Sequence, residues 1–255
     1  MKDKLIIALD VPTRREALRL VAELRGAVGM FKVGSQLFTA AGPDVVREIV
    51  AAGERVFLDL KFHDIPNTVA AACVEAARLG VSLINVHALG GAEMMRRAVE
   101  IVDETTRREA LQRPAIIAVT VLTSADVAAL EEVGLPTDPQ TQVIKLARLA
   151  DACGLNGVVA SPHEIAVVRA QVARQDFIIV TPGVRPIGIS HDDQKRVMTP
   201  AAAIRAGADY LVVGRAILRA ADPARAAAEI VAEISQSAQP SVDSPDRART
   251  SSSNA

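Results

Sequence analysis

The chain has 255 residues, half of them apolar, and a formal net charge of −1 at pH 7. This length and apolar content are sufficient for one domain with a large buried core. The near balance of charge and an aromatic content of only 2% argue against nucleic acid as the main partner, because such sites need a basic surface and stacking side chains.

Short apolar runs alternate with helical patterns along most of the chain. The predicted strands cover residues 5–9, 30–34, 55–61, 83–87, 115–122, 157–160, 177–181 and 210–214. Helices are predicted between them, including residues 15–24, 44–52, 67–79, 92–108, 140–153, 163–173 and 200–206. A strand and helix repeated about eight times favours an α/β fold, a single-domain (β/α)8 TIM barrel. An open doubly wound sheet is the alternative.

The composition changes near the end of the chain. From residue 235 onward, Ser, Pro, Asp and Arg replace the aliphatic residues. Such a segment cannot bury enough apolar surface to offset the entropy lost on ordering. The sequence therefore predicts a barrel domain over residues 1–234 and a disordered tail over residues 235–255.

The two cysteines and the start of the chain indicate the compartment. Cys73 and Cys153 lie far apart in helical patterns without the spacing of metal ligands, so packing thiols in a reducing compartment are expected. The first residues lead directly into a strand, and no apolar run is long enough to span a membrane. We expect a cytoplasmic protein with no signal peptide.

The segment of residues 59–68, Asp-Leu-Lys-Phe-His-Asp-Ile-Pro-Asn-Thr, is the most informative part of the sequence. Side chains alternate along a strand, so Asp59 and Lys61 are expected on one face. Burying an unpaired charge is costly, and adjacent charges at a strand end are therefore expected to pair or to serve a function. Pro66 suits the first turn of the next helix, which places Asp64 in a strand-to-helix loop.

Further candidate site residues occur where predicted strands end, and in a parallel barrel these ends build the active site. They are Asp10, Lys32, His87, Thr123, Pro182 with Gly183, and Gly214 with Arg215. Asp10 alone suits a turn, and Lys32 alone could extend to the rim. The full set contains two lysines, Lys32 and Lys61, and three carboxylates, Asp10, Asp59 and Asp64. Their convergence at the carboxyl end of the barrel favours a functional site over a purely structural ion-pair network.

Metal binding and histidine catalysis are less favoured. Asp59, His63 and Asp64 are residue types that bind divalent cations, but Lys32 and Lys61 would repel a cation at the same place. We therefore predict no metal. His87 is interpreted as a hydrogen-bonded core or loop residue rather than a catalytic one.

The loops after the last two strands have the character of a phosphate site. They contain Pro182-Gly183-Val184-Arg185 and Gly214-Arg215, whose guanidinium groups suit bidentate phosphate contacts. Residues 182–199 are long for a loop between a strand and a helix. The polar stretch 190–195 predicts a mobile lid that closes over an anion.

These motifs together resemble the orotidine 5'-phosphate decarboxylase family. The resemblance spans residues 5–234 and rests on six segments in the family's order: residues 8–10, 31–34, 59–68, 120–124, 181–186 and 213–215. The spacing Asp-x-Lys-x-x-Asp alone is shared by a wider superfamily. All six segments together are specific.

The resemblance implies decarboxylation of orotidine 5'-phosphate to UMP, the last step of de novo pyrimidine nucleotide synthesis, without a cofactor. Lys61 would protonate the ring carbon that loses carbon dioxide, and Asp59 would face the departing group. Lys32 would bridge Asp59 and the ribose. Asp10 would hold a ribose hydroxyl, and Thr123 would contact the pyrimidine.

The resemblance also implies how the phosphate is bound and how the chain assembles. The residues expected around the phosphate are Pro182, Arg185, Gln194, Gly214 and Arg215. The family's active site lies at a homodimer interface, and Asp64 and Thr68 would reach across from the partner chain.

Three other functions remain open. A magnesium-dependent sugar-phosphate decarboxylase or aldol-type synthase of the same superfamily is disfavoured by Lys32 beside Asp59 and by the Leu-Thr-Ser motif of residues 122–124. A Schiff-base aldolase would need a lysine of depressed pKa, whereas neighbouring aspartates raise it. The third is a barrel that binds a phosphorylated ligand without catalysis.

Overall fold

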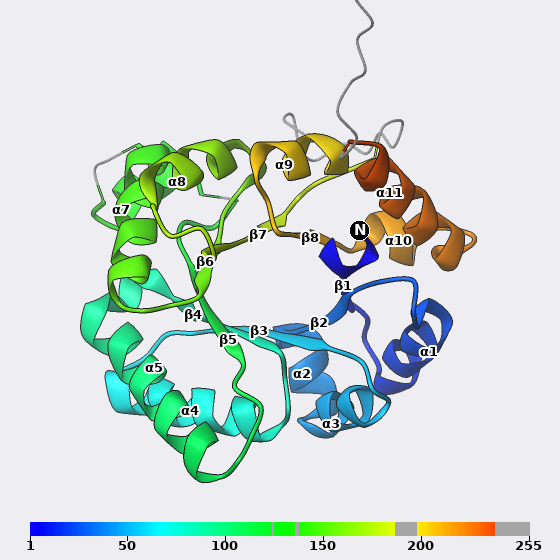
Figure 1. Ribbon diagram of the computed structural model, residues 1–255, viewed down its shortest axis with the longest axis horizontal. Helices are drawn as coiled ribbons and strands as arrows, with labels where there is room; N and C mark the ends of the chain where they lie inside the picture. The colour runs from blue at the N-terminus through cyan, green and yellow to red at the C-terminus, as the bar shows by residue number, and fades with distance from the viewer. Residues whose placement is uncertain (124, 136–137, 187–197, 238–255) are drawn as a thin grey trace, which may run out of the picture.

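The structure is a computed structural model that describes residues 1–123, 125–135, 138–186 and 198–237 (Figure 1). Eight parallel strands form a closed barrel in which each strand pairs with the next and β8 pairs with β1. The strands are β1 Leu5–Ala8, β2 Met30–Gly34, β3 Val56–Phe62, β4 Leu83–His87, β5 Ala115–Val119, β6 Gly157–Val159, β7 Ile178–Pro182 and β8 Tyr210–Val213. The predicted (β/α)8 barrel is confirmed, and an open doubly wound sheet is excluded.

Helices surround the barrel (Figure 1). They are α1 Arg14–Leu24, α2 Ser35–Ala41, α3 Asp44–Ala51, α4 Pro66–Arg78, α5 Gly91–Arg108, α6 Val127–Glu132, α7 Pro139–Ala152, α8 Ile165–Gln171, α9 Pro200–Ala206, α10 Arg215–Leu218 and α11 Pro223–Ser237. Short 3-10 turns cover Lys2–Lys4, Ala88–Gly90 and Pro162–Glu164.

Four of these helices were not assigned from the sequence. The helices α2, α6 and α10 are too short to produce a clear helical period. Helix α11 does have one, because its buried residues Ala227, Ile230 and Ile234 recur at helical spacing. This helix continues to Ser237, beyond the predicted domain end, while residues 238–255 of the predicted tail lie outside the described residues.

The barrel interior explains where polar side chains become available. Its apolar layer consists of Ile6, Ala8, Met30, Phe57, Leu83, Ile117, Val180 and Val212. Because strand side chains alternate, the residue two positions later on each strand also points inward. On three neighbouring strands that residue is polar: Lys32 follows Met30, Asp59 follows Phe57, and Asn85 follows Leu83. A polar layer thus lies on the apolar one.

The strands β3 and β5 differ from their predicted extents. Strand β5 ends at Val119, so residues 120–122 belong to the following loop. Strand β3 continues to Phe62, but its pairing with β4 shifts between Leu58, which is opposite Ile84, and Phe62, which is opposite Val86. Asp59 and Lys61 lie within this irregular segment.

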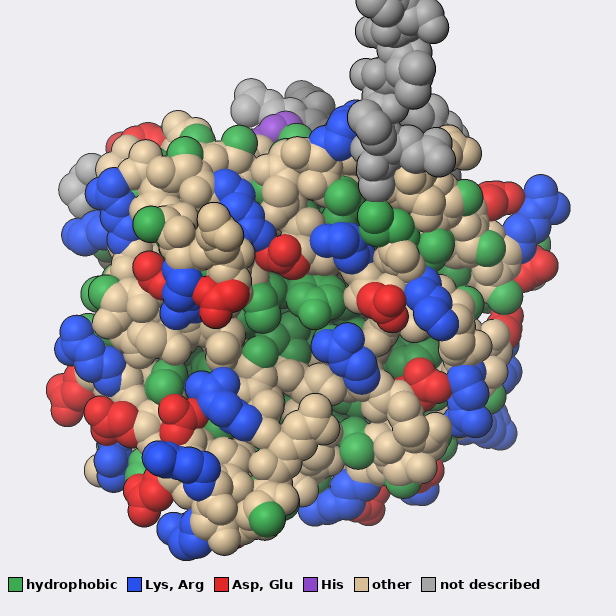
Figure 2. Space-filling model, viewed as in Figure 1, with side chains coloured by type: hydrophobic (Ala, Val, Ile, Leu, Met, Phe, Trp, Pro, Cys, Tyr) green, Lys and Arg blue, Asp and Glu red, His purple; other side chains and the backbone are tan. Residues whose placement is uncertain are grey.

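The surface agrees with the balanced composition. On the face that carries the N-terminal turn, Lys, Arg, Asp and Glu side chains of both signs surround a central group of hydrophobic ones (Figure 2). No helix among residues 1–123, 125–135, 138–186 and 198–237 is long and apolar enough to cross a membrane.

Candidate active site

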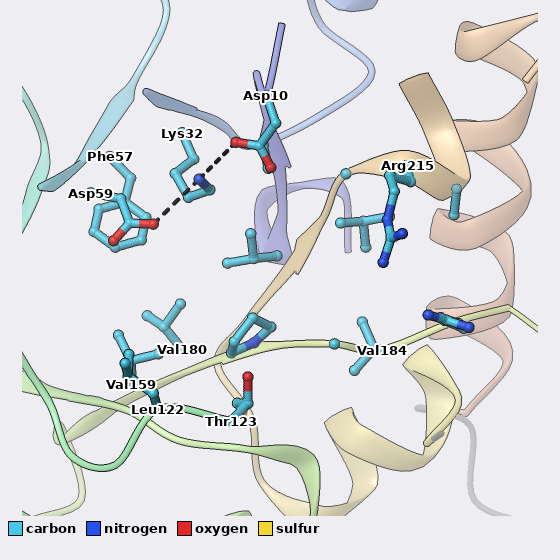
Figure 3. Close-up of a pocket in the computed structure, with 18 of the residues that line it drawn as sticks. Asp10, Lys32, Phe57, Asp59, Leu122, Thr123, Val159, Val180, Val184 and Arg215 are labelled. Carbon is cyan, nitrogen blue, oxygen red and sulfur yellow. Dashed lines mark hydrogen bonds and ion pairs between the residues drawn. The ribbon is translucent and has the colours of Figure 1, made fainter. Parts of the chain in front are cut away.

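A cavity of about 630 Å³ is lined by residues at the carboxyl ends of the strands and in the loops that follow them. Its volume is within the range of small-molecule sites. Lys32 of β2, Asp59 of β3 and Asp10, which lies just after β1, form one side, and Arg215 lies at another (Figure 3). Apolar side chains such as Val159 and Val180 complete the wall. The cavity therefore combines an ionic side with an apolar one.

The ionic side is a chain of alternating charges. The Nζ atom of Lys32 lies 3.2 Å from Oδ1 of Asp10 and 3.3 Å from Oδ2 of Asp59, and Figure 3 shows it between the two carboxylates. The Nζ atom of Lys61 lies 2.7 Å from Oδ1 of Asp59. Lys32 is buried, whereas the Lys61 side chain is 39% exposed and lines the cavity. The four charges sum to zero.

Asp59 connects the two lysines, and its ionisation is maintained by them. Burial disfavours the carboxylate, but the charges of Lys32 and Lys61 and hydrogen bonds from Lys61 and Asn85 outweigh that effect. The pKa of Asp59 is consequently held below its usual value of 3.8. Asp59, which lines the cavity, is thus ionised near neutral pH.

Lys61 has an unusual backbone conformation. Its φ of 52° lies in the left-handed region, which costs a residue other than glycine about 1 to 3 kcal/mol. The Lys61 N–H donates to Oδ1 of Asn85 at 2.8 Å. Simple strand alternation correctly predicted that Asp59 and Lys61 meet, but it did not predict the left-handed backbone conformation of Lys61.

Asn85 is a residue that the sequence analysis missed. It lies in β4, is fully buried, and donates from Nδ2 to Oδ1 of Asp59 at 2.6 Å. The signal was present in the sequence, because an asparagine interrupts the apolar run Leu-Ile-Asn-Val-His. A buried amide in a barrel strand needs polar partners, and this one finds them in the charged network.

Glycine makes room for the ionic side of the cavity. A Cβ atom on Gly34 would lie 3.0 Å from Nζ of Lys32. Gly183 adopts a φ of 78°, which permits a tight turn directly after β7.

After this turn the chain reaches Arg185, whose N–H donates to the carbonyl of Met198 at 3.1 Å. This bond joins the two ends of the segment that was predicted to be a lid, of which residues 187–197 lie outside the described residues.

Arginine side chains line the end of the cavity near β7 and β8. Arg185 and Arg215 were predicted there, and Arg219 is an addition. Arg215 begins α10 and Arg219 directly follows it, so the two are four residues apart on one helical face. Neither Arg215 nor Arg219 has an ion-pair partner in the part of the chain that the structure describes. Their charge is therefore available to an anion.

Most of the predicted site residues come together. Those that line the cavity are Asp10, Lys32, Asp59, Lys61, Thr123, Pro182, Arg185, Gly214 and Arg215. Asp64 and Thr68 are exposed and do not line it, and Asp64 accepts a hydrogen bond from the N–H of Ile65 at 2.6 Å. Gln194 lies outside the described residues.

The histidines near Lys61 do not line the cavity. The rings of His63 and His87 stack with centroids 5.3 Å apart. Burial, together with the charges of His63 and Lys61, lowers the pKa of His87. Its Nδ1 is buried without a hydrogen-bond partner among the described residues, which differs from the hydrogen-bonded histidine that was expected. Within these residues, no group of three or more His, Cys, Asp or Glu side chains is arranged to hold a metal ion.

Comparisons with known proteins agree with the geometry. The model of the Orotidine 5'-phosphate decarboxylase / HUMPS family matches residues 3–230. The chain is 54% identical over 231 residues to orotidine 5'-phosphate decarboxylase of Geotalea daltonii, covering 91% of this chain and 95% of that protein. It is 55% identical over 236 residues to the enzyme of the same name from Moorella thermoacetica, covering 91% and 92%. The crystal structure of orotidine 5'-phosphate decarboxylase from Lactobacillus acidophilus matches with a TM-score of 0.80 and 35% identity, covering 90% and 98%.

Proposed function

The chain belongs to the Orotidine 5'-phosphate decarboxylase / HUMPS family and is a carboxy-lyase acting on orotidine 5'-phosphate, and we propose that it forms UMP in the cavity described above without a cofactor. The observation that carries the proposal is the alternating chain of Asp10, Lys32, Asp59 and Lys61 on the cavity wall. This reaction would be the last step of de novo pyrimidine nucleotide synthesis, and we propose that it takes place in the cytoplasm.

The chemistry requires a cation at the carbon that loses carbon dioxide. Cleavage of that bond leaves an electron pair on the ring carbon, which water stabilises poorly, so the site must favour the transition state over the substrate. The ammonium group of Lys61 would stabilise this charge and then transfer a proton to the same carbon. Asp59 accepts a hydrogen bond from that ammonium group at 2.7 Å and would hold it in position.

Asp59 has a second proposed effect. A substrate carboxylate about 4 Å away would be repelled by about 4 kcal/mol at an effective dielectric constant of about 20, and the repulsion would fade as neutral carbon dioxide forms. The binding energy that offsets this repulsion would come from remote parts of the nucleotide. Asp10 and Lys32 would hold the ribose, and Thr123 would contact the pyrimidine.

The phosphate would be bound at the arginine end of the cavity. Arg185 and Arg215 line this end, and guanidinium groups bind phosphate through paired, charge-assisted hydrogen bonds. Pro182 and Gly214 line the same end and would shape it. Gln194 would complete the contacts from the proposed lid.

We propose a homodimer with shared active sites. Asp64 and Thr68 lie on the surface next to Ile65, which is 66% exposed. Stacking of His63 on His87 brings this loop beside the one that holds Leu89, which is 41% exposed. The two exposed apolar side chains suit a partner surface. From such a surface, Asp64 and Thr68 would enter the cavity of the second chain.

An absorbance assay tests the activity. Purified protein treated with a chelator should convert orotidine 5'-phosphate to UMP, with loss of the substrate's ultraviolet absorbance. A flat trace at high enzyme concentration would refute the proposal. Activity that returns only with magnesium would favour the metal-dependent synthase, whereas borohydride trapping of a covalent adduct would favour the aldolase. Tight nucleotide binding without turnover would identify a binding protein.

Mixing two inactive variants tests the shared site. In a mixed dimer of Lys61→Ala and Asp64→Ala chains, one cavity carries both lesions and the other carries none. Activity should therefore return on mixing under conditions in which subunits exchange. If both residues served the cavity of their own chain, every cavity would keep one lesion, and the mixture would remain inactive.

A further inference from the structure

We propose that Asn85 is a positioning residue that holds Asp59 and Lys61 in their reactive arrangement. The inference rests on the proposed function, but it concerns a side chain outside the substrate cavity. Asn85 is fully buried in β4 and is not among the residues that line the cavity. It would therefore act on the reaction only through the two residues that it contacts.

The amide of Asn85 contacts both members of the pair. Its Oδ1 accepts from the backbone N–H of Lys61 at 2.8 Å, and its Nδ2 donates to Oδ1 of Asp59 at 2.6 Å. A backbone N–H can only donate and an ionised carboxylate can only accept. Only one orientation of the amide satisfies both partners, with Oδ1 toward the N–H of Lys61 and Nδ2 toward the carboxylate of Asp59.

The location of Asn85 explains why the pair needs support. Strand β3 loses regular pairing with β4 between Leu58, opposite Ile84, and Phe62, opposite Val86. Asn85 is the β4 residue opposite this irregular segment. Its side chain replaces the missing backbone pairing and gives a partner to the N–H of Lys61, whose φ is in the left-handed region.

The contacts of Asn85 are specific to the site. On the other side of β4 its register partner is Ile117, which offers no polar side chain. Oδ1 of Asp59 accepts from both Nδ2 of Asn85 and Nζ of Lys61, so the amide also sets the position of the ammonium group. Loss of the amide would free the Lys61 backbone to leave the left-handed conformation and move Nζ away from the reacting carbon.

Steady-state kinetics of Asn85→Ala test this role. Displacement of a catalytic group by about 1 Å can reduce a rate about 100-fold, so kcat should fall on that order. KM should stay within about threefold, because groups that bind the nucleotide are untouched. The affinity for UMP, measured by calorimetry, should remain that of the native protein. A kcat within about threefold of the native value would overturn the proposal.

Asn156 provides a matched control at the other end of the barrel. Its Oδ1 accepts from the backbone N–H of Ile116 at 2.9 Å and from Arg113 at 3.0 Å. Asn156→Ala therefore removes a comparable contact to a neighbouring strand without touching the site. It should lower the unfolding temperature and leave kcat within about twofold. An equal loss of kcat in both variants would show that Asn85 is merely structural.

The isosteric variant Asn85→Asp gives a readout that a structural role would not produce. The introduced carboxyl can still accept from the N–H of Lys61, but when ionised it repels Asp59. One proton shared by the two carboxyls restores a donor toward Asp59, so kcat should rise as the pH is lowered from about 8 to about 5, unlike that of the native enzyme. Identical pH profiles would contradict the proposal.

A crystal structure of Asn85→Ala separates this inference from the proposed function. Absence of turnover by the native protein would refute the proposed function alone. In that case the position of Lys61 would still decide the role of Asn85. A regular extended backbone with Nζ displaced from Asp59 would support it, and an unchanged Lys61 would refute it.

Discussion

Each end of the barrel carries a network of charged side chains, but the two networks have different partners. At the amino end, Arg169 donates to the backbone carbonyls of Gly207 and Phe177 and also pairs with Asp209. At the carboxyl end, Lys61 pairs with a side-chain carboxylate and extends into the cavity. One network joins segments of backbone, whereas the other leaves a cation beside a cavity.

The two ends of the barrel also use different cations, Arg169 at the amino end and Lys61 at the carboxyl end. Arginine has five donors in a rigid fork and keeps its proton in proteins, which suits the joining of several backbone acceptors. Lysine has a compact ammonium group that can transfer its proton. The role of a charged cluster in this barrel thus follows from the groups that it contacts. Donors that bond to backbone carbonyls indicate stability, and donors that face a cavity indicate chemistry.

The largest expected effect is that of Lys61→Ala. In the proposed mechanism the substitution removes both the charge that stabilises the carbanion and the proton that is transferred to it, so kcat should fall by at least about 10⁴-fold. Initial rates at high enzyme concentration would measure this loss. A loss of kcat smaller than tenfold would contradict a catalytic role for the charged network at the carboxyl end of the barrel.

Arg169→Ala probes the amino end. The substitution removes the side-chain donor of two backbone carbonyls and the cationic partner of Asp209, whose carboxylate keeps only the N–H of Ile179 as a donor among the described residues. The free energy of unfolding should therefore fall by about 2 to 4 kcal/mol. Urea titration would measure this change, and kcat per folded molecule should stay at the native value. A reduced kcat in the folded protein would show that the amino end also serves catalysis.

Arg215→Ala tests the arginine end of the cavity. Loss of a charge-assisted contact to phosphate should lower kcat/KM by about 10- to 100-fold. Arg225→Ala is the control, because Arg225 pairs with Glu229 on the exposed side of α11, away from the cavity. Equal kinetics of the two variants would contradict a phosphate site at Arg215.

The smallest expected effect is a pH dependence of stability. Because the folded pKa of Asp59 lies below 3.8, its contribution is fully present above that unfolded value and is lost as the pH falls through the folded pKa. The free energy of unfolding, measured by urea titration, should fall less between about pH 6 and about pH 3 for Asp59→Asn than for the native chain. Equal losses would show that the ion pairs of Asp59 do not stabilise the fold.

Much of this architecture could be predicted from the sequence, because apolar runs and strand-end charges follow simple periodicities. Asp10, Lys32, Asp59 and Lys61 belong to strands or strand ends, and barrel closure brings such ends together. Asn85 itself was visible as a polar break in an apolar run, but its partners could not be predicted, because they depend on an irregular pairing of β3 with β4 that leaves no periodic signal.

Other features depend on contacts between distant segments. Arg219 faces the cavity only because α10 begins directly after β8 and places it one turn beyond Arg215. Asp64 and Thr68 lie on the exposed surface, outside the cavity of their own chain, because the loop after β3 carries them away from it.

A comparison of Lys61→Arg with the native enzyme tests whether Lys61 acts as the proton donor. Arginine retains the positive charge beside Asp59 but cannot give up its proton. We expect Lys61→Arg to bind UMP within about tenfold of the native affinity and yet to lose at least about 10³-fold in kcat. Turnover within tenfold of the native enzyme would contradict the claim that Lys61 delivers the proton.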